Sequence, residues 1–268
     1  MNSLLRCQRL FIFIALWSIS VSAQTPAPTT THDQQPRYFS ASQVNWIPLL
    51  PPPPAADSPQ QQRDLQAVLE LQAANQQGTR REQAIADAEA SCFRFADVLG
   101  PAFNAGKLPQ TAAFLERAAK EGNAATGILK RYWQRPRPFV VSDKVERLAD
   151  ISPLYLAKLL PAATQNALGN SSYPSGHATY GTLCAILLSQ MVPEKQAPLF
   201  QRALDYGESR VIVGAHFPSD VLAGKVIATA AAAVMSQNTV FQHDLSIARG
   251  ELRTALGLSV KNSGAAPQ

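Results

Sequence analysis

The stretch SRVIVGAHFPSD, residues 209–220, connects two segments with helical character, one ending near Val213 and the other beginning at Pro218. Proline is favoured as the first residue of a helix but cannot extend the helix before it, because it lacks the N–H and clashes with the preceding turn. The chain is therefore predicted to turn here, with His216 in the turn and Asp220 at the start of the second helix.

Helical signals cover most of the remaining chain. Ser58 and Pro59 fit an N-cap followed by the first helical residue. Further helices are predicted over 109–131, 153–160, 175–192, 195–213, 218–237 and 239–256. Alternating apolar and polar runs bounded by hairpin signals, which would indicate strands, are not evident. We predict an all-α fold, a single helical-bundle domain over residues 58–258.

One more helix is predicted from Thr79 to the Gly100-Pro101 pair. Thr79 followed by Glu82 fits a capping box, and glycine followed by proline commonly ends a helix. Apolar residues recur inside this segment at steps of three and four, which predicts one buried face. These residues are Ile85, Ala88, Cys92, Phe95 and Leu99.

The first 23 residues have the pattern of a secretory signal peptide. Arg6 and Arg9 precede a short apolar run over 10–17, and the small residues of 21–23 offer a cleavage site. An uncleaved anchor is the alternative, although this run is shorter than a typical membrane span. We predict cleavage near Ala23 and a periplasmic or secreted location.

The segment 24–57 is rich in Pro, Thr and Gln and includes four consecutive prolines at 51–54. It is predicted to be an extended lead-in that lies along the domain rather than a folded module. The tail 259–268 is small and polar and is predicted to be disordered. No later segment is expected to span a bilayer.

Loss of Arg6 and Arg9 with the signal would lower the formal net charge from +5 to +3. This charge suits small anions and is weak evidence for a nucleic-acid partner. Cys7 would also be lost, which leaves Cys92 and Cys184 in a compartment that permits disulfides. The sequence fits a disulfide between these two cysteines and two separate buried thiols equally well.

A basic stretch, KRYWQRPRP, spans residues 130–138. Prolines on both sides of Arg137 restrict the backbone there, which helps aim its guanidinium. The arginine fork matches phosphate oxygens, and Lys130 adds a compact charge. Taken alone, the stretch fits a solvated basic patch, or one that touches nucleic acid, at least as well.

The stretch YPSGH, residues 173–177, introduces a strongly helical segment. Ser175 fits an N-cap, and the free N–H groups that follow it form an anion site at the helix start. Gly176 would let a phosphate approach the backbone, and His177 could donate a proton to it. An ordinary cap with a surface histidine is the alternative.

The opening stretch, 209–220, adds Arg210, His216 and Asp220. A carboxylate four residues after a histidine could bond its far ring nitrogen, fix its tautomer and leave the other nitrogen nucleophilic. A histidine paired with a carboxylate for stability alone is the competing interpretation.

Together the three stretches fit K-x6-R-P from Lys130, P-S-G-H from Pro174 and S-R-x5-H-x3-D from Ser209. This order and spacing resembles the signature of the type 2 phosphatidic acid phosphatase superfamily, which includes the vanadium-dependent haloperoxidases. Within it, the secretory start, the Leu-Pro-Pro-Pro-Pro segment at 50–54 and the chain length resemble the bacterial class A non-specific acid phosphatases. The resemblance extends loosely over 46–256.

The resemblance implies a metal-independent acid phosphatase of broad range that forms a phosphohistidine and is inhibited by vanadate. His216 would attack phosphorus, Asp220 would orient it, and His177 would protonate the leaving alcohol. The phosphate oxygens would be held by Lys130, Arg137, Ser175, Gly176 and Arg210. No cofactor is implied, and the sequence contains no His-x-His or His-Glu-x-x-His pattern for a metal.

The implied partners are small phosphomonoesters, with no nucleic acid and no stable membrane insertion, and a homo-oligomer is plausible by resemblance. Phosphotransfer to alcohols is a possible side activity. The alternatives within the superfamily are a lipid phosphate or diphosphate phosphatase and a haloperoxidase. A secreted nucleic-acid or anion-binding protein without catalysis is the alternative from another class, but it leaves both histidines and Asp220 unexplained.

Overall fold

The computed structural model describes residues 36–149 and 171–259, and within them it contains helices and no strand. An isolated bridge pairs Pro136 with Ser171. The all-α prediction is confirmed. The predicted signal peptide and the predicted helix 153–160 lie outside the described residues, as does the tail after residue 259.

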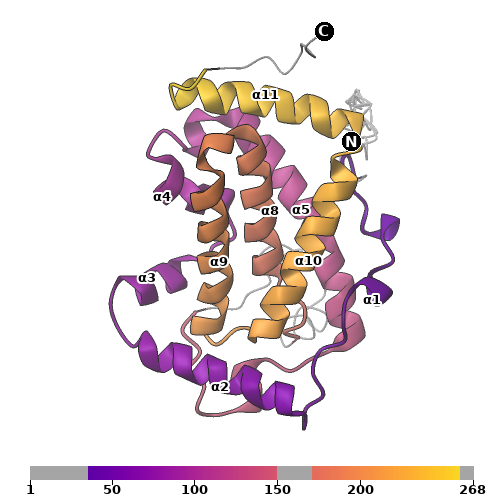
Figure 1. The fold of residues 1–268 in the computed structure, drawn as a ribbon, viewed down its shortest axis with the longest axis vertical. Helices are drawn as coiled ribbons and strands as arrows, with labels where there is room; N and C mark the ends of the chain where they lie inside the picture. Colours follow the sequence, from indigo (N-terminus) through magenta and orange to yellow (C-terminus); the bar gives the residue numbers. More distant parts are fainter. Residues whose placement is uncertain (1–35, 150–170, 260–268) are drawn as a thin grey trace, which may run out of the picture. The chain divides into compact units, whose positions relative to one another are not determined.

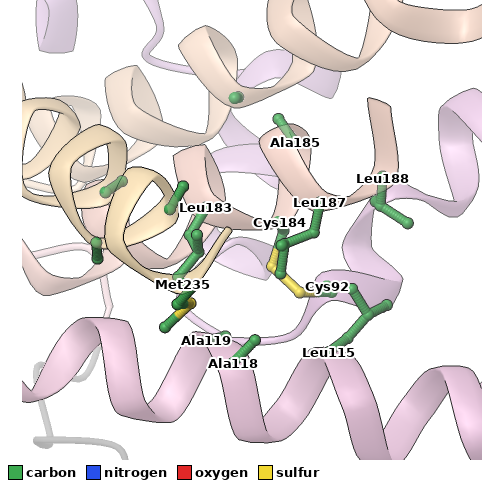
Figure 2. Close-up of a cluster of buried hydrophobic side chains, with 14 of the residues drawn as sticks. Cys92, Leu115, Ala118, Ala119, Leu183, Cys184, Ala185, Leu187, Leu188 and Met235 are labelled. Carbon is green, nitrogen blue, oxygen red and sulfur yellow. A yellow bond between two sulfur atoms is a disulfide. The ribbon is translucent and has the colours of Figure 1, made fainter. Parts of the chain in front are cut away.

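Helix α8 (Gly176–Met191) packs against α5 (Pro109–Trp133), α9 (Gln196–Ile212) and α10 (Pro218–Met235) (Figure 1). Its apolar residues occur all round the helix, which is the pattern of a core helix rather than of a surface one. In Figure 2, Leu183 of α8 lies close to Met235 of α10, and both belong to the main hydrophobic cluster. The predicted helices 109–131, 175–192, 195–213 and 218–237 are confirmed to within a few residues at their ends.

The outer helices cover this group. Helix α11 (Thr239–Ala255) packs on α5 and α8, while α2 (Pro59–Ala74) and α3 (Thr79–Ala86) pack on α9. Ser58 caps α2 as predicted, with its hydroxyl accepting from Gln61 N. The shorter helical segments are Ala41–Gln43, α1 (Trp46–Leu49), Cys92–Phe95, α4 (Ala96–Leu99), Ala105–Lys107, α6 (Pro138–Val141) and Pro193–Lys195.

The single helix predicted from Thr79 to Gly100 is wrong. Helix α3 ends at Ala86, its N-cap is Gly78, and Thr79 is its first residue, so the capping-box prediction is also wrong. The helix ends where Asp87, its C-cap, is completely buried and paired with Arg202, because a buried carboxylate needs a cationic partner. Ile85, predicted to be buried, is 40% exposed. Gly100 does end the last turn of this region, at φ 87°.

Cys92 and Cys184 form a disulfide, with their Cα atoms 5.4 Å apart (Figure 2). The bond joins the segment after α3 to the middle of α8 across 92 residues of sequence. A disulfide that closes a long loop stabilises the folded state by about 2–4 kcal/mol, mainly by restricting the unfolded chain. The question that the sequence left open is settled in favour of the bridge.

The lead-in is anchored to the helices from residue 36. Tyr38, Phe39, Trp46 and Leu50 belong to the main hydrophobic cluster. The Glu121 carboxylate of α5 accepts three backbone N–H bonds, at 2.8–3.0 Å, from residues 37–39. The segment therefore forms part of the folded core and is not a free linker.

Helix α10 is long and apolar enough to cross a membrane by length and composition, the only such helix among the described residues. Half of that window is buried within the protein, in contact with α5, α8 and α9. Core helices of soluble proteins pass the same test, so this helix is weak evidence for a span.

Candidate active site

Backbone contacts bring the three sequence stretches together at one end of α5, α8, α9 and α10. The Ser175 N–H donates to the Asp220 carbonyl at 3.0 Å, and the Ser172 N–H, just before the second stretch, donates to the Arg135 carbonyl of the first at 2.8 Å. Gly224 makes the first contact possible, because a Cβ there would lie 2.5 Å from the Ser175 carbonyl oxygen. The small residue lets α10 approach the start of α8.

The turn that carries His216 depends on Gly214. Its φ is 72°, and a Cβ at this position would lie 2.4 Å from the Glu146 carbonyl oxygen. Both the left-handed backbone and the close approach require glycine. The predicted turn between Val213 and Pro218 is confirmed, with Asp220 in the first turn of α10.

The start of α8 has the predicted cap. Ser175 is fully buried, and its hydroxyl accepts from Ala178 N at 3.2 Å. The N–H groups of Gly176 and His177 precede the first hydrogen bond within the helix and are available to an anion. A Cβ on Gly176 would also lie 3.3 Å from the Asn123 side-chain oxygen, so packing against α5 favours glycine here as well.

Arg210 has an unsatisfied side chain. It is fully buried in α9, yet none of its three guanidinium nitrogens has a hydrogen-bond partner among the described residues. Burial lowers its pKa to about 10, so the side chain remains charged at neutral pH. A buried charge without a partner is costly, and such a group points to an anion that binds there.

Arg137 and Lys130 add two more cations. Arg137 Nη1 donates to the Ala215 carbonyl at 2.7 Å, and Lys130 Nζ donates to the Ser171 carbonyl at 2.6 Å. Burial, and then the charge of Arg210, lowers the pKa of Arg137 to about 9. Burial, followed by the charge of Arg137, also holds the pKa of Lys130 well below its usual value.

His216 lies between Arg137 and Asp220. Arg137 Nη1 is 3.3 Å from His216 Nε2, and because arginine can only donate, this contact leaves Nε2 without a proton. His216 Nδ1 lies 3.4 Å from Asp220 Oδ2, a close contact that falls short of the hydrogen bond that the sequence predicted. Burial, then the charges of Arg137 and Lys130, holds the pKa of His216 well below 6.5, so the imidazole is neutral.

His177 is held by a loop that the sequence did not associate with the site. Its Nε2 lies 3.0 Å from the Ala88 carbonyl, which can only accept, so Nε2 carries the proton and Nδ1 remains for chemistry. Burial, followed by the charge of Arg210, holds the pKa of His177 well below 6.5.

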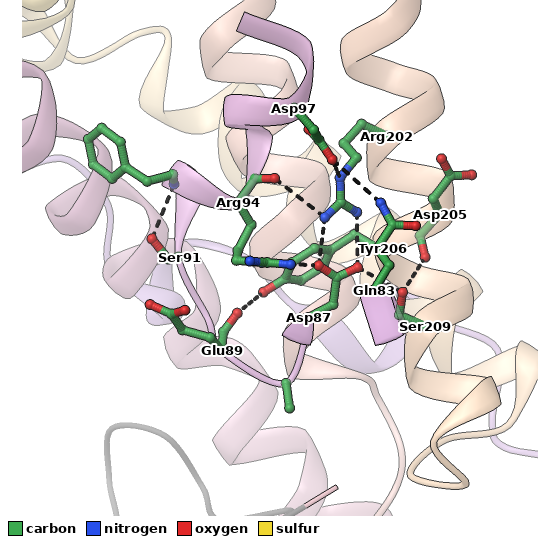
Figure 3. Close-up of polar contacts among 12 residues, drawn as sticks. Gln83, Asp87, Glu89, Ser91, Arg94, Asp97, Arg202, Asp205, Tyr206 and Ser209 are labelled. Atoms are coloured by element: carbon green, nitrogen blue, oxygen red, sulfur yellow. Dashed lines mark hydrogen bonds and ion pairs between the residues drawn. The ribbon is translucent and has the colours of Figure 1, made fainter. Parts of the chain in front are cut away.

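The loop after α3 is fixed by the buried ion pairs shown in Figure 3. Arg202 binds Asp87 through both terminal nitrogens, at 2.6 and 3.0 Å, and Ser209 donates to Asp87 at 2.8 Å. Tyr206 donates to the Glu89 carbonyl from the same helix. Helix α9 thereby holds both ends of the short segment that contacts His177.

Arg135 is a site residue that sequence reasoning missed. It lies in the predicted basic stretch, but the motif spacing directed attention to Arg137 two residues later. Arg135 is buried, and its Nη1 donates to Asp220 Oδ1 at 2.5 Å. Its place between Gln134 and Pro136 was no signal by itself, because only the fold brings Arg135 beside Asp220.

The structure therefore gathers all eight predicted site residues around one point. They are Lys130, Arg137, Ser175, Gly176, His177, Arg210, His216 and Asp220. Two buried arginines, a half-buried lysine and a helix start, next to two neutral histidines, suit the binding of a phosphoryl group and its transfer to nitrogen.

Comparison with known proteins agrees with this arrangement. Residues 118–243 match the PAP2 superfamily. The chain is 34% identical over 229 residues to the non-specific acid phosphatase of Salmonella typhimurium, which covers 84% of this chain and 86% of that protein. It is 30% identical over 259 residues to the acid phosphatase of Zymomonas mobilis, over 94% of this chain and 93% of that one. The chain therefore belongs to the bacterial non-specific acid phosphatases of the PAP2 superfamily.

Proposed function

We propose that the protein hydrolyses phosphate monoesters of broad range through a phosphohistidine on His216, without a metal ion. The observation that carries the proposal is the fully buried Arg210 guanidinium, which has no hydrogen-bond partner in residues 36–149 and 171–259. Arg137 and Lys130 supply further positive charge around the same histidine, as their effect on its pKa indicates. Three fixed cations can stabilise the transferring phosphoryl group as metal ions do elsewhere.

In the first step His216 Nε2 attacks phosphorus, and the bond from phosphorus to the ester oxygen breaks. The leaving oxygen takes a proton from protonated His177 Nδ1, so the alcohol departs neutral. His216 keeps its Nδ1 proton and becomes a cationic phosphoimidazole. The nearby Asp220 carboxylate, 3.4 Å from Nδ1, stabilises that positive charge.

In the second step His177, now neutral, takes a proton from water as the water oxygen attacks phosphorus. The phosphorus–nitrogen bond breaks, its electron pair returns to His216 Nε2, and phosphate is released. An alcohol in place of water would give phosphotransfer by the same route, as a side reaction. Vanadate, which adopts the geometry of the five-coordinate phosphorus, is expected to inhibit.

The test is a substrate panel with trapping of the phosphoenzyme by an alkaline quench. Nucleotides, sugar phosphates, aryl phosphates, diphosphates and lipid phosphates are hydrolysed with and without EDTA, with 32P-labelled monoester used for trapping. We expect monoester turnover, a protein-bound label that is stable to base and labile to acid, and nearly unchanged rates in EDTA. A strict metal requirement, or turnover of lipid phosphates alone, would overturn the proposal.

The pH dependence of kcat/KM and of kcat should differ. In the free protein, burial and the charge of Arg210 lower the pKa of His177. As the pH rises, His177 therefore loses its acidic proton at a lower pH than an ordinary histidine does. A bound phosphate dianion should raise this pKa by about one to three units through its opposite charge. The alkaline limb of kcat, which reports the bound state, should therefore lie at higher pH than that of kcat/KM.

Rate profiles between pH 4 and 9 check this expectation. The second ionisation of the ester also enters kcat/KM, so two esters with different second pKa values separate the substrate from His177. Coincident limbs, or activity that rises steadily to pH 9, would contradict the proposed role of His177 as general acid.

We also propose that the protein acts in the periplasm or outside the cell. The signal-like pattern of residues 1–23 supports export. The Cys92–Cys184 disulfide supports an oxidising compartment. Fractionation of cells, with the mass of the recovered chain, tests both the location and cleavage near Ala23, and gel filtration tests the predicted homo-oligomer.

A further inference from the structure

We propose that Arg135 and Asp64 are positioning residues for the nucleophile: Arg135 fixes the Asp220 carboxylate, and Asp64 balances the charge of Arg135. The inference rests on the proposed role of His216 as nucleophile. Neither residue belongs to the three motifs, and Asp64 lies outside residues 118–243, which match the family.

The first observation is how Asp220 is held. Arg135 Nη1 donates to Asp220 Oδ1 at 2.5 Å, and the Phe217 N–H donates to Asp220 Oδ2 at 2.8 Å. Asp220 Oδ2 is also the oxygen that lies 3.4 Å from His216 Nδ1. With one oxygen held by Arg135 and the other by the helix start, the carboxylate has one orientation toward the imidazole.

The second observation is how Arg135 itself is held. Its Nη2 donates to Asp64 Oδ2 at 2.8 Å and to Gln61 Oε1 at 2.6 Å, both on α2. Its Nη1 donates to Ser219 Oγ at 2.7 Å, and the Ser219 hydroxyl donates in turn to Asp64. The guanidinium carbon also lies 4.1 Å from the centre of the Phe217 ring.

These contacts use the planar fork of arginine. One terminal nitrogen faces Asp220 and the other faces Asp64, so a single side chain connects the carboxylates of α2 and α10. Lysine would supply the charge but not two fixed donor directions. The side chains of Arg135, Asp64 and Asp220 are all at most 4% exposed, so solvent does not screen them.

The charges explain why Asp64 is needed. Paired only with Arg135, Asp220 would present a nearly neutral ion pair to His216. Asp64 adds a second negative charge, and the group of three keeps a net charge of about −1 beside the imidazole. That charge matters because His216 is surrounded by Lys130, Arg137 and Arg210, which oppose any positive charge on it. Phosphorylation places a positive charge on the ring, so the excess negative charge stabilises the intermediate.

The experiment compares Arg135→Lys and Asp64→Asn with the unmodified protein. We expect kcat and the single-turnover rate of phosphoenzyme formation to fall roughly 10- to 100-fold, as for other residues that orient a reactive side chain. KM and the affinity for inorganic phosphate should change by less than about threefold, because the three cations that bind phosphate are untouched.

Arg253→Lys is the matched control. Arg253 is also a buried arginine, bound to Glu194 at 2.7 and 3.0 Å, but it connects α11 to the segment after α8, away from the site. We expect it to lower thermal stability, as Arg135→Lys does, while kcat stays at the unmodified value. Asp64→Asn, which keeps the side-chain shape, decides the question if Arg135→Lys does not fold.

Two results would overturn the positioning role. One is kcat within about threefold of the unmodified protein in Asp64→Asn, with the label still trapped on His216. The other is loss of phosphate affinity in the same proportion as kcat, which would mean that the whole site had collapsed. If instead the label is not on His216 at all, the proposed function fails, and that is read from the unmodified protein alone.

Discussion

Replacement of His216 by asparagine is expected to abolish turnover and the acid-labile phosphoenzyme. The imidazole is buried and neutral, and its Nε2 is left without a proton by the contact from Arg137. No other described side chain in the site offers a deprotonated nitrogen in that position. Removal of a nucleophile that acts as part of a catalytic group commonly lowers kcat by about 10⁴-fold or more. Turnover of a 32P-labelled monoester, followed by an alkaline quench that preserves a phosphohistidine, measures both effects.

His243→Asn is the matched control for this variant. His243 is exposed on α11, in no contact with the site, and it should leave turnover and label unchanged. Inorganic phosphate should still bind to His216→Asn, because Arg137, Arg210 and Lys130 remain. A retained acid-labile label in His216→Asn would place the nucleophile elsewhere.

The sequence was sufficient to predict those parts of the candidate site whose local structure is decided within a short stretch. A cap such as Ser175, or the turn that carries His216, is decided by neighbours within a few residues, so local rules predict it. The same holds for the long apolar helices. The order of the motifs then indicated that they meet, and the structure confirms that they do.

Local sequence rules could not predict contacts between segments that are distant in the chain. Asp64 and Arg135 are 71 residues apart, and nothing local to either predicts that they pair. The break after Ala86 has the same origin, because burial of Asp87 against Arg202 overrides a good helical pattern. The loop that holds His177 through Ala88 was predicted to be helix, so its role in the site could not be seen.

Arg210→Met is expected to make the free protein more stable and nearly inactive. The Arg210 side chain is fully buried and lacks hydrogen-bond partners in the part of the chain that the structure describes, so the folded protein bears the cost of desolvating its charge. An apolar side chain of similar size removes that cost. Replacement of a poorly compensated buried charge can stabilise by about 1–4 kcal/mol. For a domain of this size, that raises Tm by roughly 2–4 °C per kcal/mol.

The activity should change in the opposite direction. An arginine that stabilises a transferring phosphoryl group contributes about 10³- to 10⁵-fold to the rate, so kcat/KM should fall by at least 10³-fold. Phosphate should raise the Tm of the unmodified protein, since saturation at 100 times Kd adds about 2.7 kcal/mol. Arg210→Met should lose most of that increase.

Arg202→Met gives the comparison that isolates the cause. Arg202 lies on the same helix and is almost as buried, but it is bound to Asp87 and Asp97. Its removal leaves the buried Asp87 carboxylate with only Arg94, at 3.3 Å, and the Ser209 hydroxyl, and breaking a buried ion pair commonly costs about 3–5 kcal/mol. The two arginines of α9 should therefore have opposite effects on Tm in phosphate-free buffer. If both variants lowered Tm equally, Arg210 would have a partner within the protein. Its charge would then no longer be an argument for phosphate binding.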